Sequence, residues 1–252
     1  MLQEFLSAVR GLILILIWTV LALPAALVVF PWTLITRNTD VLLRVGFWIA
    51  RAGLPLVGLR VVVHGLEDLP HGASIVMANH SSNLDPPVLI PLLPGRVVIY
   101  LKASLMRIPV LGYAMRLAGF IPVLRDGSLE GAKASSAAAQ RELERGSCLV
   151  LFPEGTRSRD GSLLPFKKGP FFLAMDSGVP VVPVSIVGAT RLLPKGSLNL
   201  KRGTITVTFH APLDPAEYGQ KEELMAAVRD AMEAGLRTPE RTAIVGSAAT
   251  SR

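Results

Sequence analysis

The sequence predicts an α/β domain built on a mixed, largely parallel sheet flanked by helices, and a membrane-associated helical segment in front of that domain. Two observations lead to this fold class. Short apolar runs alternate with longer helical stretches from residue 59 to residue 238, a pattern typical of α/β domains. In addition, residues 11–36 carry no charged side chain, and an apolar run of about 20 residues can enter a bilayer.

The apolar N-terminal run has two possible arrangements. A single helix over residues 11–36 would cross the membrane. However, Pro24 lies near the middle of the run, and proline breaks or kinks a helix. The other arrangement is therefore a re-entrant hairpin bent near Pro24. The basic flanks Arg10 and Arg37 suit the hairpin, because basic residues favour the cytoplasmic side. The sequence leaves both arrangements open.

A second helix is predicted within residues 41–59. Arg44 and Arg51 are seven residues apart and share one helical face, while Phe47 and Trp48 are available for lipid. This pattern fits a helix at the membrane interface, and an amphipathic helix packed on the domain is the alternative. Residues 1–59 are therefore assigned to a membrane-associated segment.

Seven runs rich in Val, Ile, Leu, Thr and Phe are predicted to be strands, because such residues fit a pleated, buried surface. They cover residues 59–65, 73–79, 96–102, 120–124, 147–152, 181–187 and 204–210. The domain is expected over residues 60–238. Residues 239–252, rich in Ala, Ser, Thr and Arg, are predicted to form a disordered tail.

Four helices are predicted between and after these strands. The clearest has Ser128 as an N-cap and Gly146 as a terminator. In the last helix, Leu224, Val228 and Met232 form one apolar stripe. The four cover residues 86–93, 105–118 with an interruption at Pro109, 128–145 and 221–236.

The composition narrows the classes of partner. The 252 residues carry a net charge of +7, and a basic protein usually meets nucleic acid, anionic lipid or a phosphorylated substrate. Nucleic acid is disfavoured, because there is no long Lys/Arg run, no DNA- or RNA-binding motif, and only 6% aromatic residues. The single cysteine, Cys148, excludes an internal disulfide and a cysteine-based metal cage, and its apolar surroundings predict a packing role.

The stretch "VMANHSSNLDPP", residues 77–88, is the first candidate for chemistry. His80 follows a strand, and Asp85 opens the next helix five residues later. A carboxylate on one ring nitrogen fixes the histidine tautomer and stabilises the imidazolium once the other nitrogen takes a proton. No G-x-S-x-G elbow is present, so the hydroxyl that His80 would deprotonate is assigned to a substrate.

Two other interpretations of this stretch remain open at this point. Asp85 before Pro86 is also a suitable helix N-cap followed by proline at the first helical position. A metal site is disfavoured, because His64, His71 and His210 form no ligand cluster by their spacing.

The second candidate is "LFPEGTRS", residues 151–158, which also follows a strand. Gly155 allows a ligand to approach the backbone, and Arg157 can donate two hydrogen bonds to a phosphate. Glu154 is predicted to hold Arg157 in place or to bind a polyol. A surface turn with an exposed Glu–Arg pair is the alternative. Further cations, Lys102 and Arg125, follow other strands, and the carboxyl ends of parallel strands gather ligand-binding groups at one edge.

These blocks resemble the glycerolipid acyltransferase family, specifically the bacterial 1-acyl-sn-glycerol-3-phosphate acyltransferases. "NHSSNLD" is similar to the family's N-H-x4-D block, and "FPEGTRS" closely matches its third block. "GFIPVLR" and "VPVVPVSI" are similar to the second and fourth blocks. The resemblance covers roughly residues 60–212.

The resemblance implies a fatty acyl transfer from acyl-CoA or acyl carrier protein to the sn-2 hydroxyl of lysophosphatidate, giving phosphatidate. His80 would be the general base and Asp85 would orient it, with no acyl-enzyme and no cofactor beyond the acyl donor. The expected location is the inner (cytoplasmic) membrane, with the active site facing the cytoplasm. The substrate-binding residues that it implies are Lys102, Arg125, Glu154, Gly155, Thr156 and Arg157.

Two rival functions share much of this pattern. A related lysophospholipid or ornithine-lipid O-acyltransferase would keep His80 and Asp85 and differ in its acceptor pocket. A non-catalytic lipid-binding membrane protein would keep the fold and bind lipid without turnover.

Overall fold

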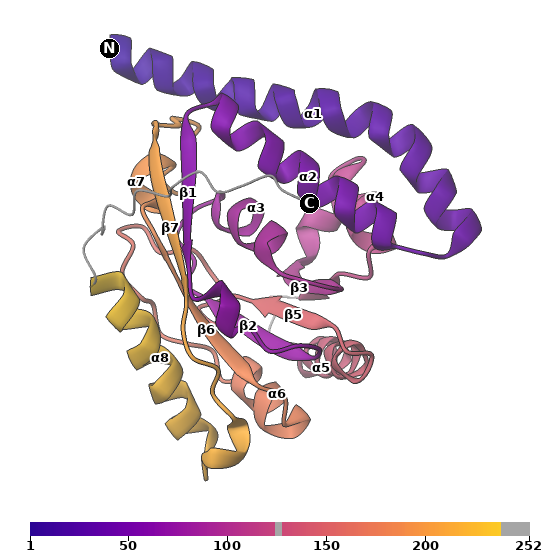
Figure 1. Ribbon diagram of the computed structural model, residues 1–252, viewed down its shortest axis with the longest axis vertical. Coiled ribbons are helices and arrows are strands. Elements are labelled where there is room, and N and C mark those ends of the chain that lie inside the picture. The colour runs from indigo at the N-terminus through magenta and orange to yellow at the C-terminus, as the bar shows by residue number, and fades with distance from the viewer. Residues whose placement is uncertain (124–127, 238–252) are drawn as a thin grey trace, which may run out of the picture.

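A computed structural model describes residues 1–123 and 128–237 of the chain (Figure 1). Two sequence predictions concern other residues. Arg125 as a substrate-binding residue and the tail at residues 239–252 both lie outside the described residues.

The described residues form one seven-stranded sheet with the order β1-β7-β6-β2-β5-β3-β4. All neighbouring strands are parallel except β6 and β7, which are antiparallel. The mixed, largely parallel sheet is therefore confirmed, and each strand lies within one residue of its predicted bounds. The strands are β1 Leu59–His64, β2 Ser74–Ala78, β3 Val97–Lys102, β4 Ile121–Val123, β5 Cys148–Leu151, β6 Val181–Val187 and β7 Gly203–Phe209.

The helices are largely those predicted, including the interruption at Pro109, with two additions, and the helix expected over residues 86–93 is α3 followed by a 3-10 turn. The helix expected over residues 105–118 is divided at Pro109 into a 3-10 turn and α4, because proline removes a backbone donor. Two short helices, α6 and α7, were not predicted. The helices after β1 are α3 Asp85–Leu89, α4 Leu111–Leu117, α5 Leu129–Glu144, α6 Gly169–Ser177, α7 Ala189–Leu192 and α8 Lys221–Arg237.

Helices cover both faces of the sheet (Figure 1). Successive side chains of a strand point to opposite faces, so Ile75 and Met77 of β2 pack under α5, α6 and α8. Val76 and Ala78 pack on the other side, with α3 and the two N-terminal helices. Strands buried on both faces read as continuous apolar runs, which is why their positions were predictable from the sequence.

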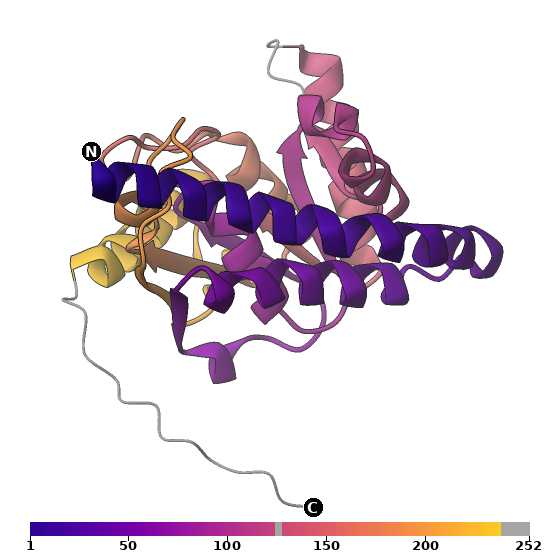
Figure 2. The ribbon, with the colours of Figure 1, turned by 90° about the horizontal axis from the view of Figure 1, so that it is seen from above.

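The N-terminal segment forms two helices, α1 Leu2–Thr36 and α2 Asp40–Leu56. They lie side by side and run in opposite directions (Figure 2). The bend expected near Pro24 is wrong, because α1 continues through it and the chain turns at residues 37–39. A proline inside a helix removes one hydrogen bond and can bend the helix without ending it. Figure 1 shows α1 curving toward its C-terminal end.

The contact between α1 and α2 depends on a small residue. A Cβ atom on Gly53 of α2 would lie 2.8 Å from Leu14 Cδ1 and 2.9 Å from Trp18 Nε1 of α1. Gly53 therefore allows the two helices to approach closely. Helix α2 packs on the domain, as the second interpretation of residues 41–59 expected, because it buries Leu54, while Trp48 is 60% exposed.

Helix α1 is attached to the domain at both ends. The Leu200 N–H donates to the carbonyl of Ser7 over 2.9 Å, and Val29 packs with α2 and α4 in a separate apolar cluster. Among the described helices, α1 is the one long and apolar enough to cross a membrane by length and composition. Its exposed apolar side chains indicate membrane association and include Leu12, Ile13, Leu16, Val20, Leu23, Leu27, Val28 and Ile35.

Candidate active site

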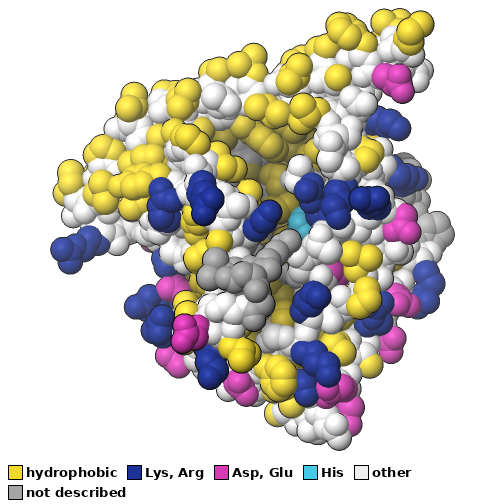
Figure 3. Space-filling view, turned by 180° about the vertical axis from the view of Figure 1, so that it is seen from behind, with side chains coloured by type: hydrophobic (Ala, Val, Ile, Leu, Met, Phe, Trp, Pro, Cys, Tyr) yellow, Lys and Arg dark blue, Asp and Glu magenta, His cyan; other side chains and the backbone are white. Residues whose placement is uncertain are grey.

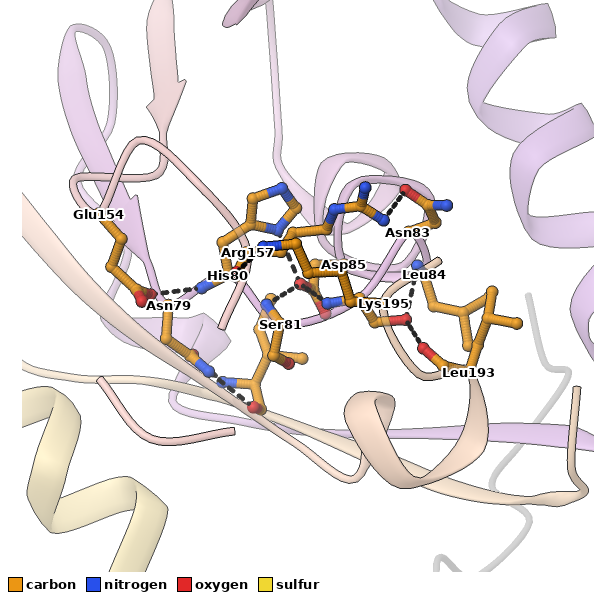
Figure 4. A network of polar contacts seen from close by, with 12 residues as sticks. Asn79, His80, Ser81, Asn83, Leu84, Asp85, Glu154, Arg157, Leu193 and Lys195 are labelled. Carbon is orange, nitrogen blue, oxygen red and sulfur yellow. Dashed lines mark hydrogen bonds and ion pairs between the residues drawn. The ribbon is translucent and has the colours of Figure 1, made fainter. Parts of the chain in front are cut away.

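The two sequence blocks meet because β2 and β5 are parallel neighbours. Met77 of β2 is paired with Leu151 of β5, so both strands end at the same edge of the sheet. The loop that follows β2 then lies beside the loop that follows β5 (Figure 4). This edge holds the carboxyl ends of parallel strands, where ligands bind in α/β folds.

The predicted contact between His80 and Asp85 is formed. Asp85 Oδ2 lies 2.8 Å from His80 Nδ1 and also accepts the N–H groups of Ser81 and Ser82, each over 2.7 Å. The Asp85 side chain is fully buried. The helix-cap interpretation is wrong, because Leu84 is the N-cap residue of α3 and makes no side-chain cap. The carboxylate instead orders the loop before the helix and the imidazole above it.

The imidazole of His80 is held from several sides. Its ring stacks on Phe152 with a centroid distance of 4.1 Å and an interplanar angle of 22°. The backbone N–H of His80 donates to Glu154 Oε1 over 2.7 Å, and the backbone carbonyl of His80 accepts the N–H of Ser158 over 2.7 Å. Ring nitrogen Nδ1 of His80 is hydrogen-bonded to Asp85, whereas Nε2 has no hydrogen-bond partner within residues 1–123 and 128–237. With 17% of its side chain exposed, His80 can offer Nε2 to a substrate.

Glu154 has a different role from the one predicted. Its carboxylate accepts the N–H of His80 through Oε1 and the N–H of Leu164 through Oε2, the latter over 2.9 Å. The predicted contact with Arg157 is wrong, because both oxygens of this 2%-exposed residue are directed to backbone groups. Burial raises the pKa of Glu154, and the two N–H donors oppose this shift. Glu154 thus fixes the position of His80 from the neighbouring loop.

Arg157 lies on the outer side of the same loop. Its Nη1 donates to Asn83 Oδ1 over 2.6 Å, and its carbonyl accepts Lys195 Nζ over 2.6 Å (Figure 4). Gly155, with φ of +69°, forms the turn between Glu154 and Arg157. Since only glycine adopts this conformation without strain, it allows one side chain to point inward and the other outward.

The remaining predicted residues surround this centre less closely. Thr156 is exposed at the tip of the loop, and Lys102 is exposed at the carboxyl end of β3. Because β3 is parallel to β5, Lys102 belongs to the same edge as His80. Arg125 follows β4 in the chain and lies outside the described residues.

Three contributors were missed by the sequence analysis. Asn79 donates Nδ2–H to the carbonyl of Ile186 and accepts the Ile186 N–H, over 3.0 and 2.6 Å, so its amide extends the pairing of β2 with β6. Asn83 and Lys195 hold Arg157. Asn79 and Asn83 both lie in the "NHSSNLD" block, but the partners of all three residues are distant in sequence, so their contacts had no local signal.

One face of the molecule, the face turned away from the viewer in Figure 1, has a hollowed, basic surface around a histidine side chain. Figure 3 shows that histidine in a hollow between lysine and arginine side chains, with a broad hydrophobic surface next to it. The carboxylate-supported imidazole of His80, with Arg157 and Lys102 at the same edge of the sheet, can remove a proton from a hydroxyl of an anionic molecule.

Replacing Cys148 with serine is expected to leave the turnover rate largely unchanged. Cys148 is 6% exposed and begins β5, at the opposite edge of the sheet from His80, and burial raises the pKa of its thiol to about 11. A buried, protonated thiol is a poor nucleophile. Steady-state rates of both proteins, with a thermal melt to detect a loss of stability, test this expectation. An inactive but folded Cys148→Ser protein would contradict it.

Comparisons with known proteins agree with this geometry. A family model described as "Acyltransferase" matches residues 60–187. The chain is 31% identical over 203 residues to a 1-acyl-sn-glycerol-3-phosphate acyltransferase of Borreliella burgdorferi, covering 77% of this chain and 80% of that protein. It is 34% identical over 182 residues to the protein of the same name from Salmonella typhimurium, covering 71% and 74%.

A chloroplastic relative and a solved structure add to this comparison. The chain is 36% identical over 167 residues to a chloroplastic 1-acyl-sn-glycerol-3-phosphate acyltransferase of Brassica napus, covering 65% of this chain and 46% of the relative, and so spans about half of that relative's length. The crystal structure of the 1-acyl-sn-glycerophosphate acyltransferase from Thermotoga maritima has a TM-score of 0.80 at 28% identity and covers 92% of this chain and 95% of that chain.

Proposed function

Since the chain belongs to the acyltransferase family that includes the 1-acyl-sn-glycerol-3-phosphate acyltransferases, we propose that it transfers a fatty acyl group from a thioester to the sn-2 hydroxyl of lysophosphatidate. The product is phosphatidate. One observation carries this proposal: the buried carboxylate of Asp85 holds His80 by Nδ1 and leaves Nε2 without a partner within the described residues.

The proposed reaction is a direct transfer. His80 Nε2 takes the proton of the acceptor hydroxyl while the hydroxyl oxygen attacks the carbonyl carbon of the thioester. Asp85 stabilises the resulting imidazolium through Nδ1–H. The tetrahedral intermediate then expels the thiolate, which takes this proton from the imidazolium and leaves as a thiol. The acyl group never resides on the protein, in agreement with the position of Cys148 at the far edge.

Arg157 is the proposed main contact for the acceptor phosphate. Its guanidinium is placed by Asn83, and its loop is held by Lys195, so it requires little reordering on binding. Lys102 at the same edge and Arg125 complete the proposed cation set, with Gly155 and Thr156 presenting the loop backbone and hydroxyl. We assign Glu154 to positioning His80, and not to substrate contact, because both of its oxygens accept backbone N–H groups.

Replacing Arg157 with glutamine is expected to lower kcat/KM for lysophosphatidate by about 10- to 100-fold, the contribution of a charge-assisted phosphate contact. A neutral acceptor, monoacylglycerol, should be affected far less, because it carries no phosphate. Acylation of both acceptors by both proteins is the measurement. Arg159→Gln, on the exposed part of the same loop, is the matched control.

The same assay separates the rival functions. A panel with lysophosphatidate, lysophosphatidylethanolamine and a lyso-ornithine lipid identifies the acceptor that is turned over fastest. If Arg157→Gln lowered kcat/KM equally for lysophosphatidate and for monoacylglycerol, the proposed contact between Arg157 and the acceptor phosphate would be contradicted. Lipid binding without turnover of any acceptor would contradict an enzymatic function.

The proposed location is the inner (cytoplasmic) membrane, with the active site on the cytoplasmic side, where thioester donors are found. We place α1 along the membrane surface and not across it. A helix of 35 residues is about 52 Å long, and it is attached to the domain at Ser7 and again at Val29. A spanning orientation would draw the domain itself into the bilayer.

Single cysteines at positions 5 and 38, in a Cys148→Ser background, test this orientation. Neither position should react with a membrane-impermeant thiol reagent in spheroplasts, and both should react once the membrane is opened. Position 5 lies in the first two turns of α1 and position 38 lies just after its end, so both lie on the cytoplasmic side if α1 does not span. Labelling of either cysteine from outside would contradict the surface orientation.

A further inference from the structure

A second basic pocket lies at the same edge of the sheet as His80. It has a volume of about 650 Å³, within the range of roughly 300–1,000 Å³ typical of small-molecule sites. Its wall combines three cations, Arg191, Lys201 and Arg202, with the apolar Leu192 and Pro194. The segment from residue 188 to residue 204 contains no acidic side chain. The pocket thus offers positive charge beside an apolar wall.

Glycines give the pocket its shape and place one of its cations. A Cβ atom on Gly188 would lie 2.5 Å from the carbonyl oxygen of Thr204, so the loop crosses β7 closely only because residue 188 is glycine. A Cβ atom on Gly58 would lie 2.7 Å from Arg202 Cγ. The stem of Arg202 therefore packs over Gly58, which restricts the side chain, while Arg202 itself remains exposed.

The loop that lines this pocket also contacts the candidate active site. Leu192 lines the pocket, and the carbonyl of the next residue, Leu193, accepts the Ser82 hydroxyl over 2.7 Å. Further along, Lys195 donates to the carbonyl of Arg157. Consecutive Cα atoms are about 3.8 Å apart, so one short loop both lines the pocket and contacts residues of the His80–Asp85 site.

We propose that this pocket binds the phosphorylated nucleotide end of a coenzyme A thioester, an inference that rests on the proposed acyl transfer. The nucleotide end carries three phosphate groups, which suit Lys201, Arg202 and Arg191, and an adenine ring, which suits the apolar wall. The acyl-bearing arm then extends past the loop toward His80. The acceptor phosphate has its own cation, Arg157, which is not among the residues that line the pocket, so donor and acceptor do not compete for one site.

The test compares two double variants of the full chain in detergent micelles. Lys201→Gln/Arg202→Gln removes two pocket cations. Lys133→Gln/Arg141→Gln removes the same charge from exposed positions on α5, outside the pocket lining. Coenzyme A itself is the probe, and its affinity is measured by titration calorimetry without turnover. The single variant Lys201→Gln is a second test if the double variant is less stable in a thermal melt.

The pocket variant should bind coenzyme A at least about tenfold more weakly, the effect of losing a charge-assisted phosphate contact. Its KM for acyl-CoA should rise by a similar factor, with KM for lysophosphatidate and kcat unchanged. The α5 variant should behave like the wild type. Affinity for coenzyme A should also fall with added salt, because exposed charges are screened.

Three results would overturn the inference. The first is unchanged affinity for coenzyme A in the pocket variant, and the second is an equal loss in the α5 variant. The third is a wild type that binds no coenzyme A but binds phosphatidylglycerol vesicles through Lys201 and Arg202, which would assign the pocket to a lipid headgroup.

The test also separates a failure of this inference from a failure of the proposed function. Phosphatidate formation from acylated acyl carrier protein alone, without binding of coenzyme A, would refute this inference and leave the proposed function intact. Tight coenzyme A binding without acyl transfer would refute the proposed function alone.

Discussion

Replacing His80 with alanine is expected to reduce acyl transfer by about 10²- to 10⁴-fold, the usual contribution of a positioned general base. The reason is local: Nε2 of His80 is the ring nitrogen that Asp85 leaves open at the site. Another histidine cannot substitute. His210 Nε2 lies 2.8 Å from Ser185 Oγ, and the Ser185 hydroxyl donates to the carbonyl of Met232 in α8. His210 is therefore engaged in a hydrogen-bonded contact on the face of the sheet that α8 covers.

The loss in the His80→Ala protein must be separated from misfolding. Its melting temperature and far-UV circular dichroism should match those of the wild type, because the backbone bonds of residue 80 to Glu154 and Ser158 do not need the imidazole. His71→Ala, on the partly exposed loop before β2, is the matched control and should retain full activity. A folded His80→Ala protein with near-normal turnover would refute the general-base role.

The second largest effect is expected from Asp85→Asn, on the order of 10²-fold or more in kcat, as for other carboxylates that support an imidazolium. An amide oxygen can still accept the N–H groups of Ser81 and Ser82, which Asp85 Oδ2 binds. The loop can therefore keep its shape. The negative charge next to His80 Nδ1 is lost, and the imidazolium is no longer stabilised as the proton is transferred.

Rate measurements at saturating donor and acceptor test this prediction. KM for lysophosphatidate should change little, because Asp85 is fully buried and does not face the acceptor. Asp176→Asn, at an exposed position of α6, is the control for the loss of one carboxylate. A loss confined to KM, with kcat unchanged, would show that Asp85 serves substrate binding instead.

Much of the fold followed from local patterns. The central strands are buried on both faces, so each reads as an apolar run bounded by polar or turn residues, and their limits were predicted closely. The His80–Asp85 contact was also predictable, because only a short loop separates His80 from Asp85 at the start of α3. Its geometry depends on two neighbouring N–H groups, those of Ser81 and Ser82, that converge on the same carboxylate oxygen.

The errors concern tertiary contacts. A proline such as Pro24 predicts a break, but α2 packs along α1 on both sides of Pro24, through Gly53 before it and Val29 after it, and these contacts favour a continuous helix. Glu154 was paired with Arg157 because they are close in sequence, whereas its partner is the backbone of His80 in another loop. Lys195 gave no local signal, because its contact with Arg157 depends on how the loop after β6 folds over the edge of the sheet.

The central claim is that the acyl group passes directly from the thioester to the acceptor hydroxyl. Acyl-CoA is mixed with an equimolar amount of the protein in the absence of acceptor, and the released thiol and the intact protein mass are measured. If the protein does not use coenzyme A, acylated acyl carrier protein replaces acyl-CoA. The account predicts no thiol above the hydrolysis background and an unmodified mass, followed by one thiol per phosphatidate once lysophosphatidate is added. One equivalent of thiol before that addition, together with a protein heavier by one acyl group, would contradict the account.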